Sequence, residues 1–245
     1  MRVIARLDIK NDSVIKGIHL EGLRKVGDPN ILAKRYYEDG IDEILLIDSV
    51  ASLYGRNNLF DVLRKASQEV FVPITIGGGL RNLDDVSFAL DSGADKIAIN
   101  TAAVERPDLI EEIAKKYGSQ CVVASIQAKK KNENDWEVYK ETGREKTGIR
   151  VSEWVKQLES LGAGEILLTS VDKEGTKSGF DKELSKMVNE LVNIPVIVSG
   201  GFGEREHLVQ LKNVVHPSGI AFASVLHYNV FSSLDLSEMV NQVFC

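Results

Sequence analysis

The sequence predicts an α/β fold, a single (β/α)8 barrel (TIM barrel) domain over residues 1–245 that is built from two duplicated half-barrels. Short apolar runs rich in Val, Ile and Leu alternate with longer amphipathic segments, as in proteins whose parallel strands are buried on both faces. Two runs recur about 122 residues apart: EILLIDSVAS (43–52) and ITIGGGL (74–80) match EILLTSVDKEGT (165–176) and VIVSGGF (196–202). A repeat of that size holds about four strand–helix pairs, which is half of such a barrel.

The expected strands are the short apolar runs, and eight of them follow one another along the chain. They lie at 3–9, 43–49, 72–78, 96–100, 121–127, 165–171, 194–200 and 219–224. Helix-like segments between them lie at 30–40, 59–70, 83–93, 108–118, 151–162 and 183–193. Several of these begin with Asn, Asp or Ser and end with Gly, which is typical of helix caps.

Two polar, hairpin-like stretches interrupt the alternation, at Asn11–Asp28 and at 129–148. An open, doubly wound sheet is the competing fold. It needs a Gly-rich turn after its first strand, whereas the sequence there reads LDIKNDSVIKG. Because parallel barrels carry their chemistry at the carboxyl ends of the strands, we expect the functional residues at that end.

Composition excludes several classes of protein. Hydrophobic residues make up 43%, too many for a disordered chain, and the net charge of −6 argues against nucleic acid as the main ligand. The basic run Lys129–Lys131 is interpreted as a solvated loop. The two cysteines, Cys121 and Cys245, form no disulfide framework or metal spacing, and no apolar stretch is long enough for a membrane span. We expect a cytoplasmic protein with no metal and no cofactor.

Glycine-rich strand ends in both halves predict two phosphate sites. Gly77, Gly78 and Gly79 follow the third strand, and Ser199, Gly200 and Gly201 end the seventh. Glycine lets backbone N–H groups approach an anion closely, although tight turns need glycine for their own geometry. The predicted phosphate-binding residues are Gly78, Gly79, Asn100, Thr101, Gly175, Gly200, Gly201, Ala223 and Ser224. Two such sites at equivalent positions of the repeat indicate one elongated ligand with a phosphate at each end.

Longer motifs carry a resemblance to a known family. The runs LDIKNDSVIKG, DEILLIDSVAS, ITIGGGLRNLDD, GADKIAINTAAVERPDLI, GAGEILLTSVDKEGTKSGFD, IPVIVSGGFG and ASVLHY resemble the cyclase subunit of imidazole glycerol phosphate synthase. The similarity runs from about Arg2 to Tyr228. It implies that ammonia from a glutaminase subunit enters the bottom of the barrel, crosses it, and closes an imidazole ring on a bis-phosphate ribulosyl substrate.

The resemblance also implies two catalytic aspartates, at the ends of strands one and five. Asp8 matches the first, but Gln127 stands at the position of the second. A carboxylate can take up and return a proton near neutral pH, whereas a carboxamide can only form hydrogen bonds. General acid–base catalysis typically contributes about 10²–10⁴-fold, so this substitution is expected to impair ring closure severely.

Other departures lie at the same end of the barrel. Arg6 replaces the family's usual Cys, Val50 replaces a hydroxyl residue, and Glu174 replaces an Asp. We expect Arg6 to point into the barrel, pair with Asp8 and lower its pKa. Among the matching substrate-binding positions are Lys16 and Thr169.

The roles of single residues at this end stay open. Lys16 matches a substrate-contacting lysine, although an exposed lysine is the default reading. Asp48 matches an acid at the end of the second strand in the family, and we expect it to orient Asp8. His19, His207 and His216 are expected at the surface, and His227 is expected to pack rather than react.

The opposite end matches the family closely. Four residues at strand starts correspond to a ring of alternating charges that gates ammonia entry, namely Arg2, Glu43, Lys96 and Glu165. The competing interpretation is that they only cap the barrel floor, where charges usually serve stability. Inward charges at that position are costly unless they are paired.

An ammonia entrance of the family type beneath an altered cyclase site predicts a divergent paralogue. We expect a synthase subunit that forms a heterodimer with a glutaminase and passes ammonia through the barrel. Its use would be amidination of a surface-polysaccharide sugar with a third, sugar-amidotransferase protein, rather than ring closure. The alternative is a cyclase of histidine biosynthesis, which converts PRFAR and ammonia to imidazole glycerol phosphate and AICAR, with Gln127 tolerated or replaced by another acid such as Glu174. A third class is a non-enzymatic barrel that only activates the glutaminase.

Overall fold

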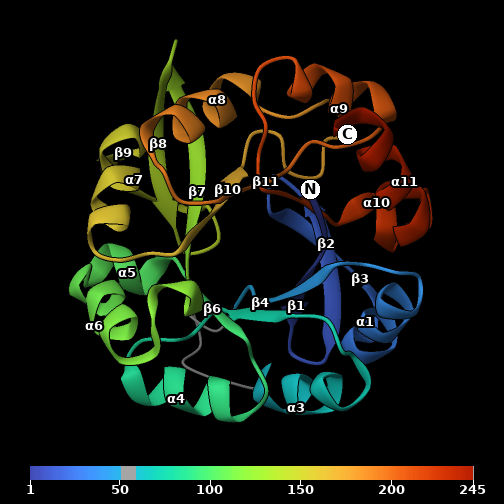
Figure 1. Cartoon of the computed structure of the whole chain (residues 1–245), viewed down its shortest axis with the longest axis horizontal. Coiled ribbons are helices and arrows are strands. Elements are labelled where there is room, and N and C mark those ends of the chain that lie inside the picture. The colour runs from blue at the N-terminus through green and yellow to red at the C-terminus, as the bar shows by residue number, and fades with distance from the viewer. Residues whose placement is uncertain (51–58, 245) are drawn as a thin grey trace.

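The computed structural model describes residues 1–50 and 59–244, and within them parallel strands close into the predicted (β/α)8 barrel. The barrel strands, in spatial order, are β1 (Arg2–Lys10), β4 (Glu43–Asp48), β5 (Ile74–Gly77), β6 (Lys96–Ile99), β7 (Val122–Asn132), β10 (Glu165–Ser170), β11 (Val196–Ser199) and β12 (Gly219–Phe222). Strand β12 pairs in parallel with β1, which closes the ring. Figure 1 looks along the barrel and shows the helices as an outer ring around the strands.

The helices of the outer ring follow the barrel strands, and six of them lie at the segments that the sequence predicts. They are α1 (Pro29–Glu38), α3 (Leu59–Glu69), α4 (Leu83–Asp91), α5 (Thr101–Glu105), α6 (Asp108–Tyr117), α7 (Val151–Ser160), α8 (Lys182–Leu191), α9 (Arg205–Lys212), α10 (Ser224–His227) and α11 (Ser233–Phe244), with a 3-10 turn at Ser119–Cys121. Asp28, Asn82 and Asp181 each accept a hydrogen bond from a backbone amide of the first turn of α1, α4 and α8 respectively. Such caps satisfy amides that have no partner inside the helix.

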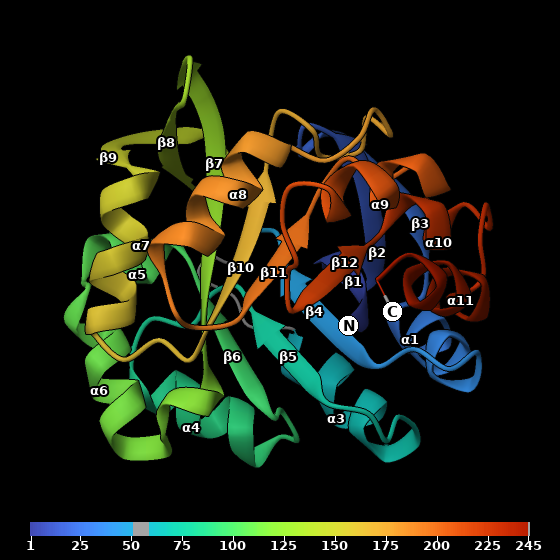
Figure 2. The same ribbon diagram turned by 45° about the horizontal axis from the view of Figure 1, so that its top comes forward.

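Both polar stretches form antiparallel hairpins. Strands β2 (Ser13–Ile18) and β3 (Glu21–Gly27) follow β1, and β8 (Asp135–Lys140) and β9 (Glu145–Arg150) follow the long strand β7. In Figure 2 the hairpin of β7 and β8 projects beyond the ends of the other barrel strands. These additions explain why β7 extends to Asn132, well past the barrel wall.

Alternating side chains divide the core into two parts. Side chains of successive strand residues point to opposite faces, so every second residue enters the barrel. The larger cluster lies between strands and helices, and a smaller one fills the lumen with Ile4, Leu45, Ala98, Val123, Leu167, Ile197 and Ala221. On β1 the same alternation places Arg2, Arg6 and Asp8 on the inward face with Ile4. The lumen is therefore an apolar layer between charged residues at its two ends.

Some residues named in the sequence analysis lie outside the described part of the chain. These are Ala51 and Ser52 at the end of the first repeated run, and the terminal Cys245. Cys121 is buried, and burial raises the pKa of its thiol. Within residues 1–50 and 59–244, no helix is both long and apolar enough to cross a membrane.

Candidate functional site

Asp8 and Arg6 form a buried ion pair at the carboxyl end of β1. Arg6 Nε donates to Asp8 Oδ1 at 3.0 Å, and the two side chains are 4% and 7% exposed. The far end of the Arg6 guanidinium group crosses the lumen, where its Nη1 donates to Thr169 Oγ1 (2.8 Å) and Ser199 Oγ (3.1 Å). The predicted pairing of Arg6 with Asp8 is confirmed. Arg6 therefore links three strands, β1, β10 and β11, across the top of the apolar layer.

The surroundings of Asp8 keep its carboxylate charged. Burial alone would raise the pKa of Asp8, but Arg6 and, to a smaller extent, Lys16 outweigh burial and lower it below the ordinary value. A group with a lowered pKa holds a proton for only a small fraction of the time near neutral pH. Asp8 in this arrangement can accept hydrogen bonds and stabilise positive charge, but it is a weak proton donor.

Lys16 is buried, so the default reading of an exposed lysine is wrong. It lies on β2 with 3% of its side chain exposed, and its Nζ donates to Glu174 and lies 3.8 Å from Asp8 Oδ2. The β2–β3 hairpin folds over the barrel end, and His19 N donates to Glu174 O across this contact. Glu174 thus forms a buried ion pair with Lys16.

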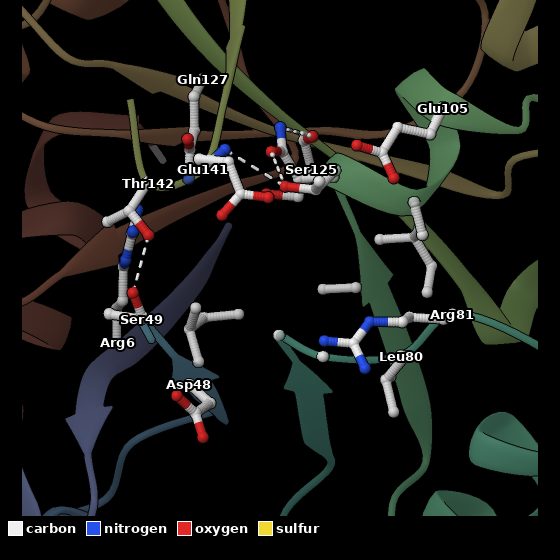
Figure 3. Close-up of a pocket in the computed structure, with 18 residues that line it drawn as sticks. Arg6, Asp48, Ser49, Leu80, Arg81, Glu105, Ser125, Gln127, Glu141 and Thr142 are labelled. Carbon is white, nitrogen blue, oxygen red and sulfur yellow. Dashed lines mark hydrogen bonds between the residues drawn. The ribbon is translucent and has the colours of Figure 1, made fainter. Parts of the chain in front are cut away.

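Gln127 lies in the wall of a pocket at the same end of the barrel as the Arg6–Asp8 pair. This pocket has a volume of about 200 Å³ and includes Asp48, Gly78, Asn100 and Gln127 in its walls. Figure 3 shows the labelled side chains arranged around the open space, with those of Gln127 and Glu141 on one side and Arg81 on the other. Arg6 also lines it, so the Arg6–Asp8 pair borders this space. Asp48 Oδ1 accepts a hydrogen bond from Val50 N at 2.9 Å.

The first predicted phosphate site forms one wall of the pocket. Gly78 and Gly79 have φ of 92° and 75°, and a Cβ added to Gly78 would lie 2.2 Å from Asp48 O. This position therefore requires glycine. Asn100 Nδ2 donates to Ser125 O at 3.0 Å, and Thr101 Oγ1 accepts from Glu141 N at 3.2 Å. Gly78, Gly79, Asn100 and Thr101 all line the pocket.

The second predicted site is a smaller hollow, lined by Gly175, Ser199, Gly200, Gly201, Ala223 and Ser224, with Glu174 beside them. Gly200 and Gly201 have φ of 99° and 101°, as the equivalent glycines of the first site do. A Cβ on Gly175 would lie 2.3 Å from Gly17 O of the β2–β3 hairpin. The structure therefore brings each predicted set of phosphate-binding residues together.

The four charged residues at the strand starts form a closed ring at the other end of the barrel. Arg2 Nη1 lies 2.7 Å from Glu43 Oε1, and Arg2 also pairs with Glu165. Lys96 Nζ lies 3.4 Å from Glu43 Oε2 and 3.0 Å from Glu165 Oε2. Each charge thus contacts two charges of opposite sign. Pairing of this kind offsets the cost of removing these groups from water.

Sequence reasoning missed Glu141 and Thr142. Both lie in the β8–β9 turn, line the pocket with Gln127, and have positive φ of 51° and 57°. The sequence signal for these two residues was weak, because KETGRE has the composition of an ordinary solvated turn. The left-handed conformation turns the chain back over the barrel end, where Thr142 Oγ1 donates to Ser49 O at 2.8 Å.

The histidines differ from one another in environment. His19 and His216 are exposed, as expected, but the surface position expected for His207 is wrong, since its side chain is 10% exposed and accepts from Gly203 N at the start of α9. His227 is buried and stacks on Tyr36, with its Nδ1 2.8 Å from the Tyr36 hydroxyl. Burial, and next Lys16, lower the pKa of His227 to about 4. Among the described residues, no group of three or more His, Cys, Asp and Glu side chains could hold a metal.

A protein-family model described as histidine biosynthesis protein matches residues 2–232. The chain belongs to this family. Three relatives are named imidazole glycerol phosphate synthase subunit HisF. That of Legionella pneumophila is 56% identical over 206 residues, covering 84% of this chain and 97% of its own length. Those of Streptococcus mutans and a Hydrogenobaculum species are 44% and 48% identical, covering 98% and 94% of this chain and 96% and 92% of their own.

Membership of the histidine biosynthesis family confirms the resemblance seen in the motifs. The family match extends over both half-barrels and therefore over the floor ring and the strand ends with the two glycine sites. Arg6 and Gln127, two of the four positions at which the resemblance leads us to expect other residues, line one pocket.

Proposed function

We propose that this chain is a synthase subunit of the imidazole glycerol phosphate synthase type. Ammonia from a glutaminase partner enters through the ring of Arg2, Glu43, Lys96 and Glu165, crosses the apolar lumen, and reacts with a phosphorylated substrate at the other end. The observation that carries the proposal is the layered barrel interior, with a closed ring of charges, an apolar layer and a polar pocket in line. The glutaminase would bind at the ring end.

Ring closure in histidine biosynthesis is the first candidate reaction. It is supported by the name of three relatives, which are 44–56% identical over most of this chain. The substrate would be the bis-phosphate ribulosyl compound PRFAR, with one phosphate at Gly78 and Gly79 and the other at Gly200 and Gly201. Asp8 would then act through its negative charge.

Transfer of ammonia to a different acceptor is the second candidate. It is favoured by Gln127, which cannot exchange a proton, together with the ion pair that holds Asp8 charged. Glu174, which would have to take over proton exchange in the first candidate, forms a buried ion pair with Lys16. The acceptor in this proposal is a sugar acetamido group of a surface polysaccharide, which a third amidotransferase protein would convert to an acetamidino group. Membership of the histidine biosynthesis family does not by itself imply this second role.

Ring closure by the purified protein separates the two candidates. The assay supplies PRFAR with saturating ammonium salt and compares the native chain with Gln127→Asp and with Arg6→Cys/Gln127→Asp. Turnover by the native chain within about tenfold of the double variant supports the first candidate. A gain of about 10²–10⁴-fold in the double variant, from a native chain that binds PRFAR equally well, supports the second. Failure of every variant to bind PRFAR would contradict both phosphate sites.

A further inference from the structure

We infer that Gln127 and Glu141 form a binding site for ammonia or a small primary amine in the pocket wall; this inference rests on the proposed ammonia-using function. Two acceptor atoms there, Gln127 Oε1 and Glu141 Oε2, are buried and have no hydrogen-bond partner within residues 1–50 and 59–244. Gln127 is 8% exposed. Figure 3 shows the Glu141 carboxylate next to Gln127 and directed toward the centre of the pocket.

The backbone holds the two side chains on one face. Gln127 of β7 pairs with Tyr139 of β8, and Glu141 follows Tyr139 by two residues. Glu141 lies in the turn after β8, where its left-handed backbone turns the chain back over the barrel end, and both side chains line the same pocket. The positive φ of Glu141 is maintained from outside the turn, because its N–H donates to Thr101 Oγ1 and the neighbouring Thr142 bonds to Ser49 O. The site is therefore preformed by several segments of the barrel.

The chemistry of these atoms selects a hydrogen-bond donor. A carboxamide oxygen and an ionised carboxylate can only accept, and a buried acceptor without a partner is unfavourable. A phosphate brings negative charge and acceptor oxygens, so it fits the backbone amides of Gly78 and Gly79 and not this wall. Ammonium and alkylammonium ions bring only N–H donors, and ammonia brings N–H donors together with the lone pair of its nitrogen. Gln127 thus retains the acceptor oxygen that an Asp would have offered, although it has lost the ability to take up a proton.

The position relative to the lumen agrees with this ligand. Val123 belongs to the apolar layer inside the barrel, and Gln127 lies four residues further along the same strand, on the same face. A molecule that leaves the apolar layer therefore meets Gln127 at the pocket wall. The pocket volume of about 200 Å³ exceeds many fold the roughly 10–15 Å³ that one water-sized molecule requires. Ammonia would hence occupy one side of a pocket that also holds a larger substrate.

Other carboxylates around the pocket do not share this property. Glu105 also lines it, but its Oε1 accepts from Lys140 Nζ at 2.7 Å and its side chain is 57% exposed. Glu105 therefore provides a matched control, since Glu105→Gln removes the same charge from the same pocket without touching the proposed acceptors.

Methylammonium chloride is the probe in a binding experiment that needs neither substrate nor partner. It is titrated into the ¹⁵N-labelled full chain, and the side-chain amide resonance of Gln127, assigned by its absence in Gln127→Glu, is followed by NMR. Sodium chloride controls for ionic strength. Tetramethylammonium chloride has the same charge as the probe but no N–H group. Backbone amide spectra of the variants show whether the fold is retained.

The expected result is a saturable shift with methylammonium and none with either control salt. Glu141→Gln should weaken binding about tenfold, since a hydrogen bond to a charged acceptor is replaced by one to a neutral acceptor, and Glu105→Gln should leave it unchanged. Equal binding by native and Glu141→Gln protein, an equal response to tetramethylammonium, or no saturable response would overturn the site. Ammonium-dependent turnover by a protein that shows no saturable methylammonium binding would still support the proposed function and would contradict only the binding site at Gln127 and Glu141.

Discussion

At the scale of single residues, the carboxyl end of the barrel contains buried charges that are paired with charges of opposite sign. Asp8 and Glu174 are buried carboxylates, and Arg6 and Lys16 are buried cations within contact distance of them. A buried pair of this kind need not stabilise the fold relative to apolar residues, but removing one partner leaves an uncompensated charge. Removing Arg6 would therefore leave the charge of Asp8 without its main partner. The carboxamide of Gln127 cannot exchange a proton, and Arg6 lowers the pKa of Asp8, so both residues reduce proton exchange at this end of the barrel.

The buried His227 predicts a pH dependence of stability. Its pKa is lowered to about 4 in the folded protein, against about 6.5 in an unfolded chain. As the pH falls from 6.5 to about 4, the unfolded chain takes up a proton that the folded chain does not. The free energy of unfolding should therefore fall by about 1.4 kcal/mol per pH unit, roughly 3 kcal/mol in all, through this one group.

Urea unfolding of native and His227→Gln protein at several pH values in this window measures the effect. His227→Gln should lose this part of the pH dependence, whatever its stability at pH 7. The exposed His216 supplies the control, because His216→Gln should keep the native slope. Parallel curves for native and His227→Gln protein would show that His227 is not held neutral by the fold.

At the scale of elements, one side chain joins the second hairpin to the barrel. Asp181 caps α8 by accepting from Leu184 N at 3.1 Å. Its other oxygen accepts from the indole of Trp136 on β8 at 3.0 Å, and all of these groups are buried. The hairpin that carries Glu141 is thus fixed to the start of a helix that lies 45 residues further along the chain.

Asp181→Ala should consequently cost more than the loss of an ordinary helix cap. It removes the cap and leaves the Trp136 N–H buried without its partner, for a combined loss of about 3 kcal/mol. Asp28→Ala, at the exposed cap of α1, should cost about 1 kcal/mol. Urea unfolding compares the two variants, and equal losses would indicate that the Trp136 bond contributes nothing to stability.

The elements were largely predictable from sequence, and the contacts within the site only in part. Continuous apolar runs mark strands buried on both faces, and polar composition marks both hairpins. The Arg6–Asp8 pair could be anticipated because residues two apart on a strand share a face. The burial of Lys16 could not, since it depends on a hairpin folding onto Glu174, 158 residues away. Glu141 was missed because its position depends on left-handed turn residues that no local pattern required.

At the scale of the whole molecule, the duplicated halves share one ring of charge. Glu43 and Glu165 are equivalent positions of the repeat, and each lies between Arg2 and Lys96. The order of signs around the ring alternates, so every neighbour is attractive. The ring also joins the start of β1 to the start of β10 across the barrel floor. Its stability should depend on this order and not merely on the number of charges present.

Exchanging two neighbours of the ring tests that dependence. Lys96→Glu/Glu165→Lys keeps the composition and net charge but places Arg2 beside a lysine and Glu43 beside a glutamate. The groups are largely shielded from water, so the repulsion is weakly screened, and we expect a loss of about 2 kcal/mol in urea unfolding. The same exchange in the exposed pair Lys186–Glu190 should change stability by less than about 0.5 kcal/mol. If the ring exchange lowers the free energy of unfolding no more than the surface exchange does, the four side chains turn outward into water in solution. The proposed ammonia entrance would then lose its structural basis.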